Sequence, residues 1–160
     1  MENINTYIIS GFPGIGKTYC FNSEFKKSLI MLDSDSSKFS WTKDKERHPM
    51  FPCNYIQHIK SNIGKVHFIF VSTHKLVRAA LEFHGVKYNL IYPTILSKDI
   101  YLQRFKSRGD NQQFIQLVSD NWVEWIEELN REEYPKIFQL NGDKCMIDII
   151  SEILSRGVKA

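Results

Sequence analysis

The chain has 160 residues, a formal net charge of +3, and a composition of 42% hydrophobic and 24% charged residues. These values are typical of one globular domain, and they permit an anionic nucleotide ligand without requiring a nucleic-acid partner. No apolar run can cross a bilayer, no basic run resembles a DNA-binding tail, and the first residues lack the basic start and apolar core of a signal peptide. We therefore expect a cytoplasmic protein with a single domain over residues 1–160 and no membrane partner.

An eight-residue stretch, Gly11-Phe12-Pro13-Gly14-Ile15-Gly16-Lys17-Thr18, organises the chain. It matches the phosphate-binding pattern G-x-x-x-x-G-K-[ST] at every fixed position. Residues 6–10 before it are typical of a buried strand, and residues 19–27 after it can form a helix. The alternative is a glycine-rich turn without a ligand, which has no need of glycine, lysine and threonine at these spacings.

The residue types of this stretch indicate what it binds. Glycines let the backbone curl so that N–H groups point at an anion, and the following helix adds its positive N-terminal end. Lys17 can reach the β- and γ-phosphates, and the Thr18 hydroxyl can hold Mg²⁺. We predict that ATP and Mg²⁺ bind here, with the nucleotide held by Gly11, Pro13, Gly14, Ile15, Gly16, Lys17 and Thr18.

Apolar strands and amphipathic helices alternate along the rest of the chain. Strands are predicted at residues 29–32, 66–71, 88–92 and 136–140. Helices are predicted at residues 54–63, after His74, from a Ser97 cap to before Gly109, from a capping box at Asp110 and Gln113, and after Gly142. The alternation predicts an α/β fold with a parallel sheet and helices on both faces.

The scattered cysteines and histidines predict no metal or disulfide site. Cys20, Cys53 and Cys145 form no C-x-x-C pair, and we expect Cys20 to pack in the first helix. The helix after Asp110 carries a stripe of large apolar side chains at helical spacing, which we interpret as core, with a base-stacking platform as the alternative. Its members are Phe114, Leu117, Val118, Trp122, Trp125 and Leu129.

Two aspartates follow the second predicted strand, in the sequence Asp33-Ser34-Asp35. In a parallel sheet they lie at the same edge as the phosphate loop, so Asp33 can assist Mg²⁺ and Asp35 can accept a proton from an attacking hydroxyl or bind an acceptor. The alternative is a solvated turn in which the side chains bond to the local backbone. We predict a functional role for both.

Arg104 and Arg108 lie four residues apart on the helix after Ser97, and they share one face of it. Two guanidinium groups aimed inward can stabilise charge on a transferred phosphoryl group, which makes both residues candidate catalytic groups. A solvated basic face is the alternative. We expect a minimal lid at about residues 104–113.

The acceptor side of the predicted site is less sharply defined. The polar, irregular stretch and the helix at about residues 38–64 form a predicted acceptor-side insertion, in which Trp41 can line a pocket or pack a loop. Arg78 can bind an anionic acceptor or lie on the surface. Ser72 and His74 follow the third strand, where polar side chains can reach the same edge of the sheet.

With these residues in place, the chain resembles small P-loop kinases over almost its whole length, above all the nucleotide-kinase-like or adenylate-kinase-like proteins encoded by bacteriophages. The resemblance implies a three-layer fold with a five-stranded parallel sheet in the order 2-3-1-4-5. Asp33-Ser34-Asp35 is similar to the Asp-x-Asp of shikimate kinases, and the segment from Val71 to Arg78 is similar to gluconate kinases. In the later part of the chain the resemblance rests on Arg104 and Arg108, which are similar to the lid arginines of nucleoside monophosphate kinases.

The chain also departs from these families. The third strand ends at Ser72, where a Walker B motif has an aspartate, and the adenylate-kinase acceptor motif Asp-Gly-Phe-Pro-Arg is absent. We expect phosphoryl transfer from ATP to a nucleoside monophosphate. The alternatives are a sugar or sugar-acid acceptor, the end of a polynucleotide, which the weak net charge disfavours, and a regulatory module that binds ATP without transferring phosphate.

Overall fold

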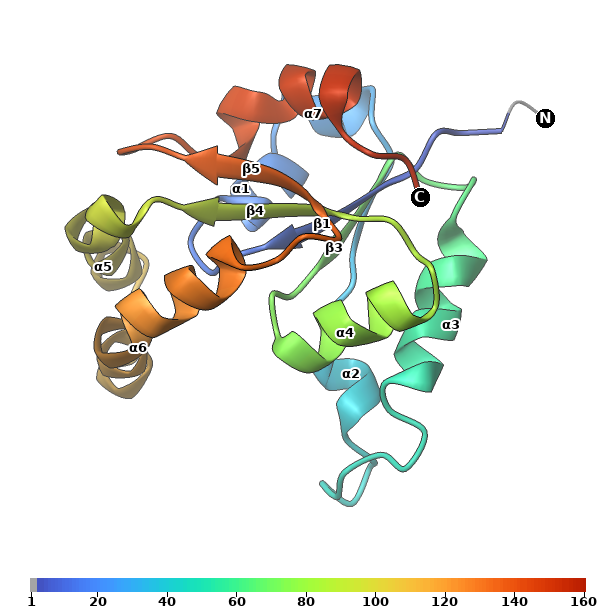
Figure 1. Cartoon of the computed structure of the whole chain (residues 1–160), viewed down its shortest axis with the longest axis horizontal. Helices are drawn as coiled ribbons and strands as arrows, with labels where there is room; N and C mark the ends of the chain where they lie inside the picture. The colour runs from blue at the N-terminus through green and yellow to red at the C-terminus, as the bar shows by residue number, and fades with distance from the viewer. Residues whose placement is uncertain (1–2) are drawn as a thin grey trace.

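The computed structural model describes residues 3–160 as one α/β domain built around a five-stranded parallel sheet (Figure 1). The strands are β1 (Tyr7–Gly11), β2 (Met31–Asp33), β3 (Phe68–Val71), β4 (Asn89–Pro93) and β5 (Lys136–Leu140). Their order in the sheet is β2-β3-β1-β4-β5, and every neighbouring pair is parallel. The predicted fold class and strand order are therefore confirmed.

Helices and short 3₁₀ turns connect the strands. The helices are α1 (Lys17–Phe21), α2 (Ser37–Ser40), α3 (Cys53–Asn62), α4 (Lys75–Phe83), α5 (Lys98–Ser107), α6 (Gln112–Asn130) and α7 (Ile150–Arg156). The 3₁₀ turns are η1 (Glu24–Lys27), η2 (Ile95–Ser97) and η3 (Met146–Ile149). In Figure 1, α1 and α7 cover one face of the sheet, α3, α4 and α6 cover the other, and α5 lies beyond the carboxyl end of β4.

The core follows from the position of each strand in the sheet. Strands β1, β3 and β4 are central and buried at every residue, as expected for short apolar strands covered by helices on both faces. Strand β2 lies at the edge of the sheet and is only partly buried, so the strand predicted at residues 29–32 is present, shifted to residues 31–33, but the prediction that it is buried is wrong. Long side chains fill both interfaces, among them Phe68, Tyr88 and Trp122.

Several predicted helix boundaries differ from the structure for local reasons. The first helix ends at Phe21 rather than near Lys27, because the chain turns at Ser23, whose hydroxyl caps η1 by accepting from the Phe25 N–H. Helix α6 begins with Asn111 as its cap, and not with Asp110 and Gln113: the Asn111 side chain accepts from the Phe114 N–H at 2.7 Å.

The stripe on α6 divides between core and surface. Val118, Trp122 and Leu129 are buried, whereas Leu117 is 52% exposed, and Phe114 and Trp125 are partly buried. Most of the stripe is therefore core, as interpreted from the sequence. Cys20 is fully buried in α1, which confirms its predicted packing.

Because all the strands are parallel, their carboxyl ends lie together at one end of the sheet. The C-terminus and the residues that lead into β1 lie at the opposite end of the sheet (Figure 1), where the Ala160 N–H donates to the Thr6 carbonyl at 2.9 Å. The carboxyl ends of β1, β2 and β3 carry the phosphate loop, the two aspartates and Ser72. The predicted insertion at 38–64 contains α2, a loop and α3, and the predicted lid at 104–113 contains the end of α5 and the connection to α6.

Candidate active site

The phosphate loop joins β1 to α1 and leaves a set of backbone donors free. Within residues 3–160, the N–H groups of Gly14, Gly16, Lys17 and Thr18 have no hydrogen-bond acceptor. Such unpaired N–H groups at a helix start form a site for an anion, because each needs an acceptor and together they carry partial positive charge. The loop therefore has the donors that a phosphate group requires.

Two glycines of the loop adopt backbone conformations that other residues resist. Gly14 and Gly16 have φ values of 83° and 93°, in the left-handed region. A Cβ on Gly14 would lie 2.8 Å from the Phe105 ring, and a Cβ on Gly16 would lie 3.2 Å from the Cβ of Cys145. The motif glycines are thus needed both for the turn of the loop and for its close packing on α5 and on the segment before η3.

Lys17 folds back over the loop, where its Nζ donates to the Gly11 carbonyl at 2.8 Å. Burial lowers the pKa of Lys17 from 10.5 to about 8, an effect that the nearby Asp33 and Asp35 partly oppose and that Arg108 reinforces. The charges that act on Lys17 show that the two aspartates and Arg108 lie around the same ammonium group. The structure thus brings these predicted residues together.

This lowered pKa leads to a first prediction. At pH 8.5 we expect Lys17 to be neutral in most molecules of the free protein. Bound phosphates favour the ammonium form and raise the pKa of Lys17. ATP binding should therefore take up as much as about 0.7 proton per molecule, which calorimetry measures by repeating the titration in buffers of different ionisation enthalpy. Lys17→Arg, whose charge is permanent, should take up none. Wild-type binding without proton uptake at this pH would contradict the assignment.

Asp33 and Asp35 differ in the contacts that their carboxylates make. Asp33 ends β2 and is exposed, with its carboxylate near Lys17. One carboxylate oxygen of Asp35 accepts from the Ser37 N–H at 2.9 Å, which is the local turn bond considered as an alternative. This bond orients the side chain, and Asp35 still lines a cavity, together with Ser72 and His74 at the end of β3. The turn and the predicted functional role are therefore compatible.

The donors around the loop fit Mg²⁺ chemistry. Mg²⁺ in phosphate sites takes one or two carboxylates together with substrate phosphates and waters, so it needs no all-protein cage. Among residues 3–160 no group of three or more His, Cys, Asp or Glu side chains is placed to hold a metal. The Ser72 hydroxyl is buried without a partner in this part of the chain, which suits a metal-bound water where a Walker B aspartate would stand. Thr18 and Asp33 remain the predicted protein ligands.

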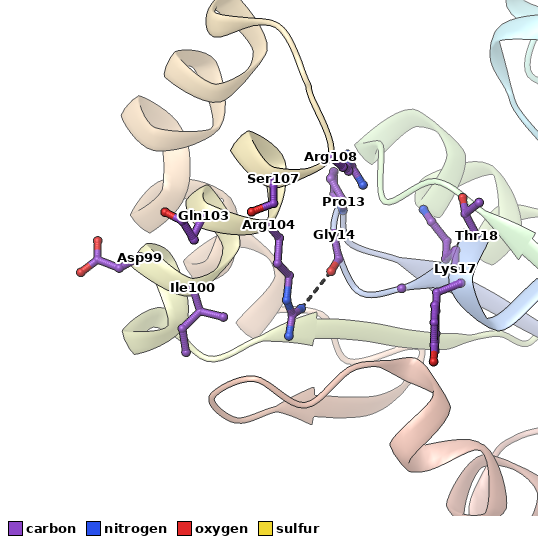
Figure 2. Close-up of a pocket in the computed structure, with 12 residues that line it drawn as sticks. Pro13, Gly14, Lys17, Thr18, Asp99, Ile100, Gln103, Arg104, Ser107 and Arg108 are labelled. Atoms are coloured by element: carbon purple, nitrogen blue, oxygen red, sulfur yellow. Dashed lines mark hydrogen bonds between the residues drawn. The ribbon is translucent and has the colours of Figure 1, made fainter. Parts of the chain in front are cut away.

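Arg104 of α5 and Arg108, which follows α5 directly, both line the cavity beside the loop, but they make different contacts (Figure 2). Arg104 donates to the Gly14 carbonyl at 2.9 Å and to the Asp143 carbonyl at 2.5 Å, so it ties the loop to the segment after β5. Arg104 lines the cavity beside the loop, and its predicted role over the phosphates stays a prediction. Arg108 is half exposed and pairs with Asp110, and its charge acts on Lys17.

A cavity of about 1000 Å³, large enough for a nucleotide, is lined by residues of the loop and of α5. Figure 2 shows the loop residues and the α5 residues facing each other across it. The residues that line this cavity include Pro13, Gly14, Gly16, Lys17, Thr18, Tyr19, Gln103, Arg104 and Arg108.

A second cavity, of about 490 Å³, lies over the ends of β2 and β3, and we call it the acceptor cavity. Its lining contains the predicted acceptor residues Asp35 and Trp41, and also Ser72 and His74. Two cations that the sequence analysis missed, Arg47 and Lys75, complete it, together with Ser36, Ser37, Ser40, Phe51, Leu76 and Val77.

These missed cations differ in how far the sequence could reveal them. Lys75 follows His74 directly after the strand end, and extending the strand-end rule by one residue would have found it. Arg47 reaches the cavity because its strand-like pairing with Trp41 folds the loop back, and its guanidinium lies 5.4 Å from the Trp41 ring and 5.1 Å from the Phe51 ring. No local pattern in the sequence indicates that pairing.

Arg78 does not lie where the sequence analysis placed it. It is 3% exposed, its Nε donates to the Thr73 carbonyl at 2.8 Å, and its other nitrogens pair with Glu128 and Glu132 of α6. Its charge is thus compensated inside the protein, and it is absent from the lining of the acceptor cavity. The surface alternative is therefore wrong. Arg78 lines a neighbouring cavity of about 350 Å³ instead, and its contact with an acceptor stays a prediction.

The strand order β2-β3-β1-β4-β5 and the glycine-rich loop between β1 and α1 define an α/β class of fold with a loop of the phosphate-binding pattern. No protein-family model matches the sequence, and no curated protein matches it. Among solved structures, the chain is similar to a gluconokinase from Sinorhizobium meliloti 1021, with a TM-score of 0.53, 11% sequence identity, and coverage of 97% of this chain and 92% of that one. At this identity the likeness is one of fold. No helix within residues 3–160 is long and apolar enough to cross a membrane.

Proposed function

We propose that the protein transfers the γ-phosphoryl group of ATP to a small anionic acceptor that carries hydroxyl groups. The observation that carries this proposal is the set of unpaired N–H groups at Gly14, Gly16, Lys17 and Thr18, with the Lys17 side chain folded over the loop and a nucleotide-sized cavity beside it. A smaller polar cavity lies over the ends of β2 and β3. Such an arrangement holds a triphosphate and leaves its end facing a second ligand.

The reaction follows from the charges around Lys17. An acceptor hydroxyl oxygen forms a bond to the γ-phosphorus while the bond from that phosphorus to the β–γ bridging oxygen breaks, and ADP leaves. Asp35 takes the hydroxyl proton, and Lys17 and Arg108 stabilise the negative charge on the transferred group. Mg²⁺, held by Thr18 and Asp33, would neutralise phosphate charge when bound. Arg104 fixes the loop that positions the phosphates.

The acceptor cavity favours a sugar acid. Its serines and Asp35 can bond to several hydroxyl groups, and Arg47 and Lys75 offer charge to a carboxylate. Arg47 has no ion pair within residues 3–160, so its charge is available to a ligand. The similarity in fold to a gluconokinase supports the same class of acceptor.

A nucleoside monophosphate, the acceptor first expected, remains the second candidate because of one feature. A cavity of about 350 Å³ lies beside the acceptor cavity and shares His74 and Lys75 with it. Phe12, Phe114 and Trp125 contribute aromatic rings to its lining, which suits the planar ring of a base.

A transfer assay with γ-labelled ATP tests the proposal and separates the candidates. The panel contains sugar acids, neutral sugars, nucleoside monophosphates and nucleosides. We expect label in a sugar acid and none in the matching neutral sugar, since the cations recognise the carboxylate. Label in nucleoside monophosphates alone would select the second candidate. ATP binding without transfer to any acceptor would favour a regulatory module instead.

A second prediction concerns Arg47. Arg47→Ala should raise the KM of the acceptor about 10- to 100-fold, which corresponds to the loss of one or two charge-assisted hydrogen bonds, while ATP affinity stays the same. Steady-state kinetics with each substrate varied in turn measures both quantities. Lys43→Ala, an exposed change in the same loop, is the matched control. An unchanged acceptor KM would remove Arg47 from the binding site.

A further inference from the structure

Ser34 holds the turn between the two aspartates by every polar atom that it has. It is 4% exposed. Its N–H donates to the Phe70 carbonyl at 3.0 Å, its carbonyl accepts from the Tyr55 hydroxyl at 2.7 Å, and its hydroxyl lies 3.0 Å from Nε2 of His58. The backbone between Asp33 and Asp35 is therefore fixed by strand β3 on one side and by helix α3 on the other.

Tyr55 and His58 stand three residues apart on α3, so they face the turn together. Tyr55 is fully buried. Burial raises the pKa of Tyr55, and the charges of Asp35 and Asp33 raise it further. The phenol thus stays protonated as a donor, and it lies close to both carboxylates without bonding to either of them.

The same tyrosine is connected to the acceptor cavity. The Phe51 ring stacks on Tyr55, with centroids 6.2 Å apart and an interplanar angle of 28°, and Phe51 lines the acceptor cavity. The Arg47 guanidinium also lies over the Phe51 ring, 5.1 Å from its centroid. Phe39 packs against both Tyr55 and His58, at 5.2 Å and 4.7 Å between ring centroids. One wall of the acceptor cavity and the aspartate turn therefore rest on the same residue.

We infer that Tyr55, assisted by His58, is a positioning residue for phosphoryl transfer. Through the Ser34 carbonyl it sets the direction in which Asp33 and Asp35 leave the backbone, and through Phe51 it links that direction to the acceptor cavity. A shift of the turn by a fraction of a hydrogen-bond length displaces both carboxylates at once, and catalysis depends steeply on such placement. The inference rests on the proposed function for its kinetic part, and its binding part can be tested without any acceptor.

Tyr55→Phe removes only the hydroxyl and keeps the ring packed. We expect kcat to fall about tenfold. We also expect a several-fold rise in the Mg²⁺ concentration at which half of the Mg²⁺-dependent gain in ATP affinity is reached, because Asp33 is no longer held in place. ATP binding without Mg²⁺ should not change. Tyr88→Phe is the matched control, since Tyr88 is also fully buried and its hydroxyl has no partner within residues 3–160.

Two further variants separate positioning from simple packing. His58→Ala, at a partly exposed site, removes the contact to the Ser34 hydroxyl and should change the Mg²⁺ dependence in the same direction. If Tyr55 acts through Asp35, the combination of Tyr55→Phe with Asp35→Asn should lower kcat by less than the product of the two single effects.

The inference is overturned if Tyr55→Phe and Tyr88→Phe show the same kcat and the same Mg²⁺ dependence of ATP binding. It is also overturned if the effects of Tyr55→Phe and Asp35→Asn simply multiply. If no acceptor is ever phosphorylated, the proposed function fails, and the Mg²⁺ dependence of binding still decides whether Tyr55 positions the turn.

Discussion

Lys17→Ala should lower kcat by about 10³-fold while leaving the fold intact, because the variant loses the one ammonium group that lies within the phosphate loop. In the free protein this group is bonded to the Gly11 carbonyl and partly desolvated, so it is already placed before ATP arrives. Its charge should act on the phosphates as negative charge grows toward the transition state. Single-turnover transfer from labelled ATP measures the loss.

The matched control for this change is Lys27→Ala, which removes an exposed lysine from η1. Circular dichroism and the melting temperature should be close to wild type for both variants. A turnover of Lys17→Ala within tenfold of the wild type would exclude Lys17 from the mechanism. It would then be a structural residue of the loop.

Arg108→Ala should lower kcat by roughly 10²- to 10³-fold and weaken ATP binding much less, because an arginine over the transferred group acts mainly in the transition state. Arg108 follows α5 directly, its charge acts on Lys17, and it is half exposed and paired with Asp110. Comparing kcat with the equilibrium affinity for ATP separates the two effects. Equal losses of rate and affinity would make Arg108 a simple phosphate anchor.

Arg131→Ala serves as the control for Arg108→Ala, since Arg131 is 79% exposed at the end of α6 and its contact with Glu127 is a loose surface pair. It should leave both quantities unchanged. Arg104→Ala should behave differently from Arg108→Ala, with ATP affinity reduced as well, because Arg104 supports the loop through the Gly14 carbonyl.

The sequence predicted the fold well where local patterns determine structure. The strands β1, β3, β4 and β5 appear close to their predicted positions, since each is a short apolar run followed by turn residues. Gly14 and Gly16 of the phosphate loop adopt the left-handed backbone that the tight turn requires, and Lys17 folds back over the loop. Asp33 and Asp35 lie near Lys17 because parallel strands place their carboxyl ends at one edge.

The sequence predicted less where contacts join distant segments. Arg78 is buried because Glu128 and Glu132, about 50 residues later, face it from α6. Arg47 belongs to the acceptor cavity only through its pairing with Trp41 across a loop. The Tyr55 contact with Ser34 also joins two elements that share no periodic pattern. Each of these contacts depends on tertiary packing, which a reading of one local segment does not contain.

The most direct test of the central claim is an amide NMR titration of the 18.8 kDa protein with ATP and Mg²⁺. If the triphosphate lies on the free N–H groups of the loop, the amide signals of Gly14, Gly16, Lys17 and Thr18 should shift first and most, and they should fail to shift in Lys17→Ala at the same ATP concentration. Shifts confined to other parts of the chain, or no shifts at millimolar ATP, would contradict the account.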